Sequence, residues 1–576
     1  MISRFGAVLV IRLIGQPRLE RDGEPIDGPR GNKTWALLGR LVRSSEPVSR
    51  QRLADELFSE ADDPMGALRW SLAELRRRTG LTGAFKGNPI SAELGEATIV
   101  DVAQMASGTI PDEVPEGEFL EGVEIKGSAG FETWVLIERQ RVDGELLSAL
   151  RQATLRALSG RHFERAIALA GAMVRRNVFE EGPHVLLVKA LAASGDEDAA
   201  LRQVEASEKM FSRELGVEPT AAIRAAARPG VATAVPGVSS RASSESLRDA
   251  GLAALSAGAA DAGIECLRGA TAAAEKSGDT ALLSECLMEL GTALVHSIRG
   301  YDDEGSVILQ LAVEAATEAG LELTAAKALS ELGYVDVLAG RRHSATQYLA
   351  AAAELATDAP ALVAALAGFE AMNLSDWGRM DQATDRFFEA LELSKSAGAL
   401  RRESWNLGLG ARTLFIQGRL KEAADWARRS CELAHQERWT AFRPWPEVWL
   451  SHVRLASGDD PDAVRRDAEA TFALARQLQD PCWEGAAAKV LGLTYLAEDE
   501  HEIALKWMAN ASTLCRRVTD SYTWIEVEIL IAEADAALKF GDGDRAESVA
   551  HRAIAAAAKG SMDNLLARAQ GVLATA

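Results

Sequence analysis

The chain has 576 residues, of which 47% are hydrophobic and 26% are charged. This length predicts three or four domains with cores of their own, and the composition excludes wholesale disorder and a membrane-embedded class. The net charge of −21 would repel the phosphates of nucleic acids if it were spread evenly over the surface. The distribution of charge therefore decides which part of the chain suits which partner.

The charge is uneven along the chain. The first 86 residues carry 15 basic and 11 acidic side chains, whereas the remaining residues carry 48 basic and 73 acidic ones. The net charge is therefore +4 before this point and −25 after it. By its charge, the N-terminal sixth is the only part suited to nucleic acid.

Three observations favour the reducing cytoplasm. The five cysteines include no C-x-x-C pair, which argues against a disulfide framework and against a cysteine-rich zinc site. The apolar segment 5–14 is interrupted by Arg12 and lacks a small-residue cleavage motif, so it is predicted to be a strand and not a signal peptide. Because no run of about 18 uncharged apolar residues occurs, no membrane-spanning helix and no membrane partner are expected.

The first 98 residues have the pattern of a winged helix-turn-helix. Residues 8–14 and 18–21 predict short strands, and Asp22-Gly23 is typical of a hairpin turn. Helical periodicity begins near Arg30, Ser49 caps a second helix, and a third runs from Asp63 to Thr79. Residues 83–94 predict a terminal hairpin, the wing.

Helical hairpins follow the winged helix. Residues 131–158, 162–176, 183–194 and 198–215 have helical periodicity and alternate with short glycine-containing turns. We expect them to form a tetratricopeptide-like domain over residues 99–228. Residues 229–246 are rich in Pro, Gly and Ser, which predicts a flexible linker.

Residues 247–576 carry a degenerate repeat of about 40 residues. Small residues mark its turns and helix crossings: Gly258, Gly300, Gly340, Gly378, Gly418, Gly458 and Gly541, with Ala345, Ala383, Ala423, Ala463 and Ala546 five residues after their glycines. One step lacks its glycine and is predicted to turn near Glu498. The segment LGLTY at 491–495, followed by Ala504 and Ala511, has tetratricopeptide spacing. The pattern predicts an α-solenoid of roughly eight hairpins, so the fold class is mainly α with small N-terminal β-sheets.

The third helix of the winged domain has two faces. Leu68, Leu72 and Leu75 form the apolar stripe, and the opposite side carries Trp70 among cationic residues. Such a helix enters the major groove, where arginines donate to guanine edges or to phosphates. The predicted DNA-binding residues on the helix are Arg69, Trp70, Ala73, Arg76 and Arg77, and those near the first two helices and the wing are Lys33, Arg50, Arg52 and Lys86.

Some of these residues have a structural interpretation as well. Arg76, Arg77 and Arg78 could neutralise the C-terminal dipole of their helix, and Trp70 could pack on the neighbouring helical domain. Arg40 and Arg43 also lie near the first two helices and could hold phosphates. We favour groove binding, because local charge, helix order and the predicted wing agree.

The first 228 residues resemble a family of bacterial activators, the SARP-type regulators, which have an OmpR-like winged helix followed by a bacterial transcriptional activation domain. The matching segments are IRLIG at 11–15, Asp22-Gly23, VSRQRL at 48–53, ALRWSLAELRR at 67–77, EFLEG at 118–122, 131–139 and ELGVEP at 214–219. The resemblance implies a DNA-binding activator whose second domain supports dimerisation and contacts RNA polymerase. Its recognition residues would be Arg69, Trp70, Ala73 and Arg77. Glu74 departs from the family, because many members carry arginine there.

No catalytic, cofactor or metal site is expected. Residues 28–34 superficially suggest a phosphate loop, but Asn32 stands where a glycine must precede the lysine. No G-x-S-x-G motif occurs, and His501-Glu502 lacks the second histidine of a zincin helix. The sequence therefore gives no support to an enzyme.

A cluster in the solenoid predicts a partner-binding surface. Trp439, Arg443, Trp445 and Trp449 lie close together in the sequence, and a concave face lined in this way could grip a peptide or an apolar effector. The alternative is that these tryptophans are framework residues wedged between stacked helices.

Together these patterns predict a cytoplasmic transcriptional regulator, an activator by resemblance. We expect its partners to be double-stranded DNA, RNA polymerase, a protein, peptide or small-molecule ligand of the solenoid, and a second copy in a homodimer. The alternative left open by the sequence is a non-enzymatic scaffold or signalling adaptor whose winged helix no longer binds DNA.

Overall fold

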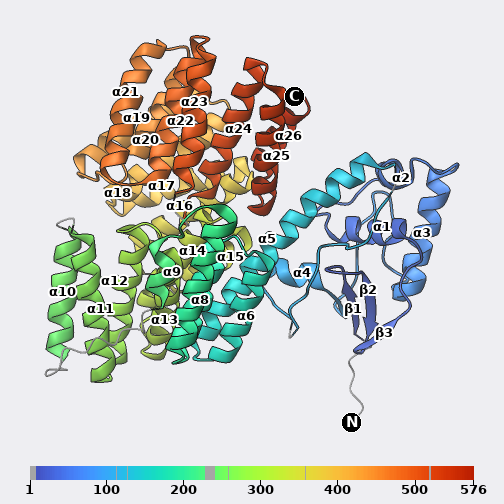
Figure 1. Ribbon diagram of the computed structural model, residues 1–576, viewed down its shortest axis with the longest axis horizontal. Coiled ribbons are helices and arrows are strands. Elements are labelled where there is room, and N and C mark those ends of the chain that lie inside the picture. The colour runs from blue at the N-terminus through green and yellow to red at the C-terminus, as the bar shows by residue number, and fades with distance from the viewer. Residues whose placement is uncertain are drawn as a thin grey trace. The chain divides into compact units, whose positions relative to one another are not determined.

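The computed structural model describes residues 8–111, 113–125, 127–227, 241–256, 259–356, 358–517 and 520–576. The chain divides into two compact units, residues 1–149 and 150–576 (Figure 1). This division falls inside a single long helix, α5 (Ala129–Ser159), and does not coincide with the domain boundaries predicted at residues 98 and 228. Each unit is described by itself below.

The first unit opens with a small β-sheet. Its strands are β1 (Leu9–Arg12), β2 (Arg18–Arg21), β3 (Glu24–Ile26) and β4 (Thr98–Val100), in the order β3-β2-β1-β4. The hairpin predicted at Asp22-Gly23 is confirmed, because both residues have positive φ and join antiparallel β2 and β3. β4 pairs in parallel with β1 and places Val100 opposite Ile11.

Three helices follow as the sequence predicts. They are α1 (Asn32–Val42), α2 (Arg50–Phe58) and α3 (Pro64–Thr79), and the short α4 (Asp101–Ala106) comes after β4. The expected caps are present, since the Ser49 side chain accepts the Arg52 N–H and the Asp63 side chain accepts the Gly66 N–H. A side-chain cap of this kind replaces one hydrogen bond missing from the first helical turn.

The wing differs from the prediction. Residues 83–94 form no paired strands, so the predicted β-hairpin is wrong. Ile90 makes only isolated bridges, one to Val48 and one to Gly87. The physical reason lies in the composition, because Pro89 has no N–H to donate to a ladder and a glycine two residues earlier weakens strand structure.

The second unit begins with the rest of α5 and further antiparallel helices. These are α6 (Phe163–Arg176), α7 (Glu181–Ala193), α8 (Glu197–Met210), the π-helical turn η1 (Phe211–Leu215) and α9 (Ala221–Ala226). The predicted linker lies partly outside the described residues, at 229–240. Its last part is helical and not a linker, because α10 (Arg241–Ser256) already begins there.

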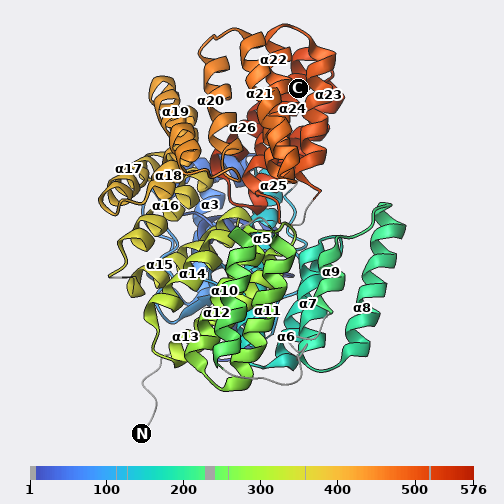
Figure 2. The ribbon, with the colours of Figure 1, turned by 90° about the vertical axis from the view of Figure 1, so that its left-hand side faces the viewer.

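The remaining chain is a stack of helical hairpins, which Figure 2 shows from the side. Within the described residues from 241 on, sixteen helices form eight consecutive pairs and α26 follows as a last single helix. The bounds of α11 to α18 are Ala260–Ser277, Thr280–His296, Asp302–Glu318, Glu322–Leu338, Arg342–Leu355, Pro360–Trp377, Met380–Ser396 and Leu400–Ile416. Those of α19 to α26 are Leu420–Gln436, Pro444–Ala456, Pro461–Gln477, Pro481–Ala497, His501–Cys515, Thr523–Phe540, Gly543–Lys559 and Asp563–Leu573. The predicted solenoid of about eight hairpins is confirmed.

The turn pattern is also confirmed. Positive φ angles occur at the predicted glycines 300, 340, 378, 418, 458 and 541, while Gly258 lies outside the described residues. In the step without a glycine, Asp499 takes φ 60°, one residue after the predicted turn. The alanine pattern fails once: Ala463 is partly exposed and Val464 is buried in its place, because Pro461 starts α21 in a different register.

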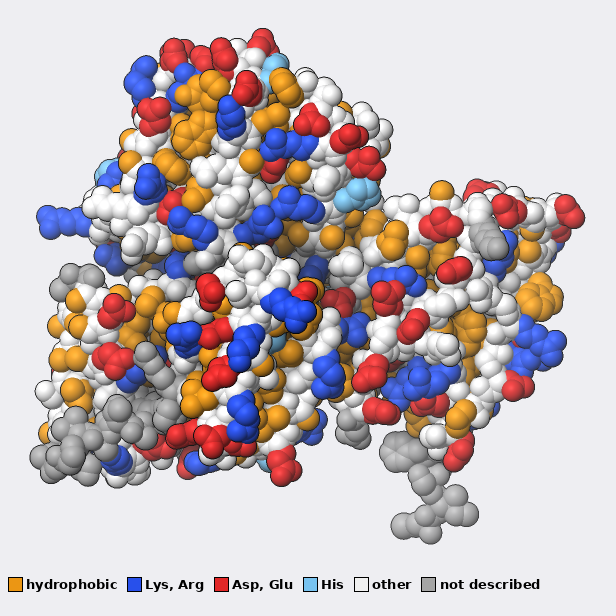
Figure 3. All heavy atoms as spheres, viewed as in Figure 1, with side chains coloured by type: hydrophobic (Ala, Val, Ile, Leu, Met, Phe, Trp, Pro, Cys, Tyr) orange, Lys and Arg blue, Asp and Glu red, His pale blue; other side chains and the backbone are white. Residues whose placement is uncertain are grey.

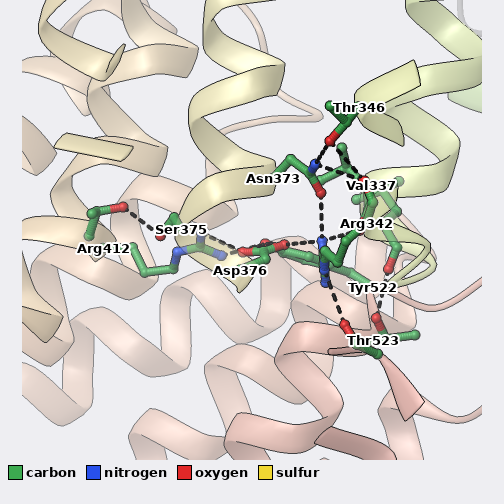
Figure 4. Close-up of polar contacts among 12 residues, drawn as sticks. Val337, Arg342, Thr346, Asn373, Ser375, Asp376, Arg412, Tyr522 and Thr523 are labelled. Atoms are coloured by element: carbon green, nitrogen blue, oxygen red, sulfur yellow. Dashed lines mark hydrogen bonds and ion pairs between the residues drawn. The ribbon is translucent and has the colours of Figure 1, made fainter. Parts of the chain in front are cut away.

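The solenoid contacts itself over long stretches of sequence. Arg299 donates to Asp480 at 2.6 Å, and the Arg342 guanidinium donates to the Gly560 carbonyl at 3.2 Å, across separations of 181 and 218 residues. Figure 4 shows the buried centre of these contacts. There Asp376 accepts the Tyr522 hydroxyl at 2.9 Å and pairs with Arg412 at 2.6 Å. Helices near the middle of the repeat array are thus tied to its last helices.

The helices before the predicted linker belong to the same compact unit as the solenoid. Arg151 in α5 pairs with Asp303 at 2.9 Å and with Asp336 at 3.4 Å. Gln152 donates to the Ser344 hydroxyl at 2.5 Å. These contacts hold the helices before residue 229 against the solenoid, whereas the predicted flexible linker would leave the two free to move apart. Among the helices of the described residues, none is both long and apolar enough to cross a bilayer.

Candidate nucleic-acid interface

The two faces of α3 are as predicted. Leu68, Leu72 and Leu75 are at most 1% exposed, whereas the opposite face is open and consists of Arg69, Trp70, Ala73 and Arg77. Trp70 is 56% exposed, so it does not serve as a packing residue within the first unit. In the space-filling view, basic side chains and an apolar one lie at the surface where α3 lies in Figure 1 (Figure 3).

The three consecutive arginines at the end of α3 have different environments. Arg76 donates to the Phe85 carbonyl at 3.0 Å and so ties the helix to the segment that was predicted as the wing. Arg78 is largely buried and pairs with Glu74 and Asp27. Arg77 also pairs with Glu74, but its side chain is 60% exposed. Arg76 and Arg78 therefore bind other groups of the first unit, whereas Arg77 is the most exposed of the three.

Glu74, the residue that departs from the family pattern, does not face outward. It is 4% exposed and accepts hydrogen bonds from Arg77 Nε at 3.1 Å and from Arg78 Nε at 3.0 Å. The hydrogen bond from Arg77, with a contribution from Arg78, lowers the pKa of Glu74 below its ordinary value. The carboxylate is therefore ionised at neutral pH, turned inward and compensated, so it presents no negative charge to an approaching phosphate.

The predicted cations outside α3 are accessible to different degrees. Arg52 is 65% exposed and pairs with Glu56, and Lys86 is exposed. Arg50 donates to the Gly87 carbonyl at 2.8 Å, which brings it to the same short segment as Lys86. The Lys33 ammonium lies 5.7 Å from the centre of the Phe58 ring, so it is partly covered by α2.

Two arginines considered as phosphate ligands have other partners. Arg43 pairs with Glu138 and Glu145 at 2.9 and 2.8 Å, and its side chain is 12% exposed. Arg40 pairs with Glu56 at 3.1 Å and is 9% exposed. A phosphate role for Arg40 and Arg43 is therefore wrong, because carboxylates already satisfy them in the core of the first unit.

The predicted partner-binding cluster is mostly interior. Trp445 is 1% and Trp449 2% exposed; they pack on each other, and Trp449 also packs on Trp524. Trp439 is partly exposed and stacks on Phe442 with ring centres 4.5 Å apart. Arg443, also partly exposed, pairs with Glu447 at 2.9 Å. The expectation of one open face lined by all four is therefore wrong, and Trp445 and Trp449 are framework residues.

The comparison with family models identifies the middle of the chain. Residues 116–229 match the family described as bacterial transcriptional activator domain. The chain carries this activator domain. The match agrees with the family resemblance of the second domain, and the matched residues include α5 to α9 and the ELGVEP segment that follows α8. The chain thus combines an N-terminal unit of helices and a four-stranded sheet, the activator domain and tetratricopeptide-like repeats.

Other known proteins resemble this chain only distantly. None of the curated proteins matches the chain significantly. EmbR of Mycobacterium tuberculosis, in complex with a low-affinity phosphopeptide, is 18% identical with a TM-score of 0.28, and the match covers 38% of this chain and 64% of EmbR, less than two thirds of its length. RapI in its apo form is 14% identical with a TM-score of 0.36, covering 49% of this chain and 96% of RapI.

A Rap protein complexed with competence and sporulation factor is 12% identical with a TM-score of 0.41, covering 68% of this chain and 98% of that one. Because all three TM-scores lie below 0.5, no property of these proteins is transferred to this chain.

Proposed function

We propose that the protein is a DNA-binding transcriptional regulator, an activator whose α3 enters the major groove of duplex DNA. The observation that carries this proposal is the outward face of α3, where Arg69 and Arg77 flank a tryptophan that is 56% exposed. An exposed indole beside two guanidinium groups suits a surface that meets both base edges and phosphates.

Several features support this use of the face. Within the part of the chain that the structure describes, Arg69 pairs weakly with Asp63 at 3.5 Å, and both side chains are more than 60% exposed. An ion pair of this kind is worth little in water, so DNA can displace it at low cost. Glu74, the one acid among the arginines of the C-terminal half of the helix, is turned inward and compensated. The face therefore presents positive charge although the whole chain is acidic.

The activator domain supports the second half of the proposal. By resemblance it arranges dimers and contacts RNA polymerase, while the solenoid receives a protein, peptide or small-molecule signal. Buried ion pairs join Arg151 of the activator domain to the solenoid. A signal that shifts the solenoid would reach the activator domain through packed contacts and not through a loose tether.

The decisive experiment compares chromosome occupancy of two variants of the full-length protein. In Arg69→Ala/Arg77→Ala two exposed arginines are lost from the α3 face. If each makes a groove or phosphate contact worth about 1–3 kcal/mol, their joint loss lowers affinity at least roughly 30-fold. We expect genome-wide footprinting to show loss of occupancy at all sites, with helicity unchanged. The melting temperature should fall only by what loss of the Arg77–Glu74 pair costs, because Arg78 still pairs with Glu74.

The matched control is Arg428→Ala/Lys506→Ala. These residues also lie on helices, are 56% and 72% exposed, and pair with exposed acids one turn away. The control should retain normal occupancy. If instead both double variants occupied the chromosome like the wild type, α3 would not be the reading surface. If the wild type itself occupied no sites, the scaffold alternative would be favoured.

A further inference from the structure

Two buried cysteines of the solenoid lie within reach of each other. Cys482 is the second residue of α22 and Cys515 is the last residue of α23. The two helices form one antiparallel hairpin, so these two ends meet. The sulfur atoms are 4.0 Å apart, whereas the S–S bond of a disulfide is about 2.05 Å long. An approach of the two sulfurs by about 2 Å would bring them to bonding distance.

The helices are unusually close at this point. A Cβ atom on Gly485 would lie 2.9 Å from the Ala511 carbonyl oxygen and 3.3 Å from Cys515 Cβ. Only glycine allows α22 to approach the end of α23 so closely. The backbone therefore already holds the two thiols together, and a disulfide needs side-chain adjustment more than a displacement of helices.

The surroundings distinguish the two sulfurs. Cys482 Sγ accepts the Cys515 S–H and also the backbone N–H of Tyr522, at 3.3 Å. The hydrogen bond to Cys482, together with burial, raises the pKa of the Cys515 thiol well above its ordinary value. Cys482 is 5% exposed and Cys515 is fully buried. Cys482 is thus the less completely buried residue of the pair, and Cys515 is a protonated thiol beside it.

We propose that Cys482 and Cys515 are a modification site, at which hydroperoxides form an intramolecular disulfide. With hydrogen peroxide, the Cys482 sulfur attacks one oxygen and the O–O bond breaks. Cys482 becomes a sulfenic acid, and the released hydroxide takes up the thiol proton and leaves as water. Cys515 sulfur then attacks Cys482 sulfur, the S–O bond breaks, and the hydroxyl leaves as a second water with the Cys515 proton. Two thiols lose two electrons, and one peroxide gains them.

The site lies beside contacts that tie the solenoid together. Asp480, which caps α22 through the Cys482 and Trp483 N–H groups, also binds Arg299 at 2.6 Å. Tyr522, whose N–H reaches Cys482, binds Asp376 through its hydroxyl. Closing the S–S bond would move the sulfur that accepts the Tyr522 N–H. Oxidation of the pair would therefore change the position of Tyr522 and its hydrogen bond to Asp376.

The test is peptide mapping of the full-length protein after exposure to hydrogen peroxide. Remaining thiols are blocked with N-ethylmaleimide before digestion without reductant. We expect a linked pair of peptides containing Cys482 and Cys515, lighter by two hydrogens than the sum of its parts and separated by dithiothreitol. The variant Cys266→Ser/Cys431→Ser, which removes two partly exposed cysteines, should give the same linked pair.

Two further variants test the order of the steps. In Cys515→Ala the sulfenic acid on Cys482 has no resolving thiol and should accumulate as a dimedone adduct, whereas Cys482→Ala should leave Cys515 unmodified. If Cys482 and Cys515 of the folded wild type stayed unlinked under conditions that oxidise Cys266, or if Cys482 were linked to another cysteine, the proposal would be overturned. A dimedone adduct on Cys515 in Cys482→Ala would contradict the assigned order.

Discussion

At the scale of single residues, the orientation of the Glu74 side chain determines the charge that α3 presents. Its position on α3 follows from helical periodicity, but its inward orientation depends on hydrogen bonds from Arg77 and Arg78. The sequence predicted which residues α3 exposes, because that needs only one helix. It did not predict that Arg43 forms ion pairs with Glu138 and Glu145, which lie 95 and 102 residues away.

Another buried carboxylate makes stability depend on pH. Glu528 in α24 is 5% exposed and pairs with Arg568 at 2.5 Å and with Lys489 at 3.4 Å. Burial acts to raise the pKa of Glu528, but the charges of Arg568 and Lys489 outweigh it and lower the pKa from 4.5 to about 2. This shift corresponds to about 3 kcal/mol of folding free energy at neutral pH.

Because the pKa is lower in the folded state, this stabilisation is present above pH 4.5 and is lost as the pH falls toward 2. Glu528→Gln mimics the protonated acid, so the difference in urea midpoint between wild type and variant should be large at pH 7 and shrink at pH 3. Glu392→Gln, at a residue that is 75% exposed, should show no such convergence. A difference for Glu528→Gln that stayed constant with pH would contradict the assignment.

At the scale of helices and hairpins, small residues set the repeat. Turn glycines with positive φ and buried alanines at crossings are local signals, and for this reason the sequence predicted the hairpins and their number. The failures at 83–94 and at Ala463 have local causes too, since a proline removes a strand in one place and shifts a helix start in the other. The burial of Trp445 and Trp449 depends on α24, which lies much later in the chain, so no local pattern indicated it.

Glycines at helix crossings should differ sharply from glycines elsewhere in the same solenoid. A Cβ atom on Gly333 in α14 would lie 2.7 Å from Leu349 Cδ2 and 2.8 Å from Leu349 Cγ. Gly333→Ala should therefore destabilise by about 1–3 kcal/mol through overpacking. Gly269, inside α11, would place its Cβ at an ordinary 3.5 Å from Leu247, so Gly269→Ala should stabilise by up to about 1 kcal/mol.

Thermal denaturation of both variants checks this contrast, with the midpoint falling for Gly333→Ala and rising for Gly269→Ala. Midpoints that moved in the same direction would mean that helix propensity, and not the close crossing, governs stability at Gly333.

At the scale of the whole molecule, two properties matter. The repeat array is tied to itself by contacts that span 181 to 220 residues, and composition cannot reveal such pairings because each partner alone resembles a surface charge. The second property is the contrast between a chain of net charge −21 and the small cationic surface of α3. Net charge alone would class the protein as one that avoids DNA, whereas the exposed arginines indicate local attraction.

The salt dependence of DNA binding by the full-length protein tests this contrast most directly. Affinity for fluorescent duplex fragments of the source chromosome is measured at a series of salt concentrations. If arginines of α3 release counterions from phosphates, the logarithm of affinity falls with the logarithm of salt at a slope of about −0.9 per phosphate contacted. We predict a steep slope for the wild type that is reduced by up to about 2 in Arg69→Ala/Arg77→Ala. A flat response, or the same slope in both proteins, would contradict the account.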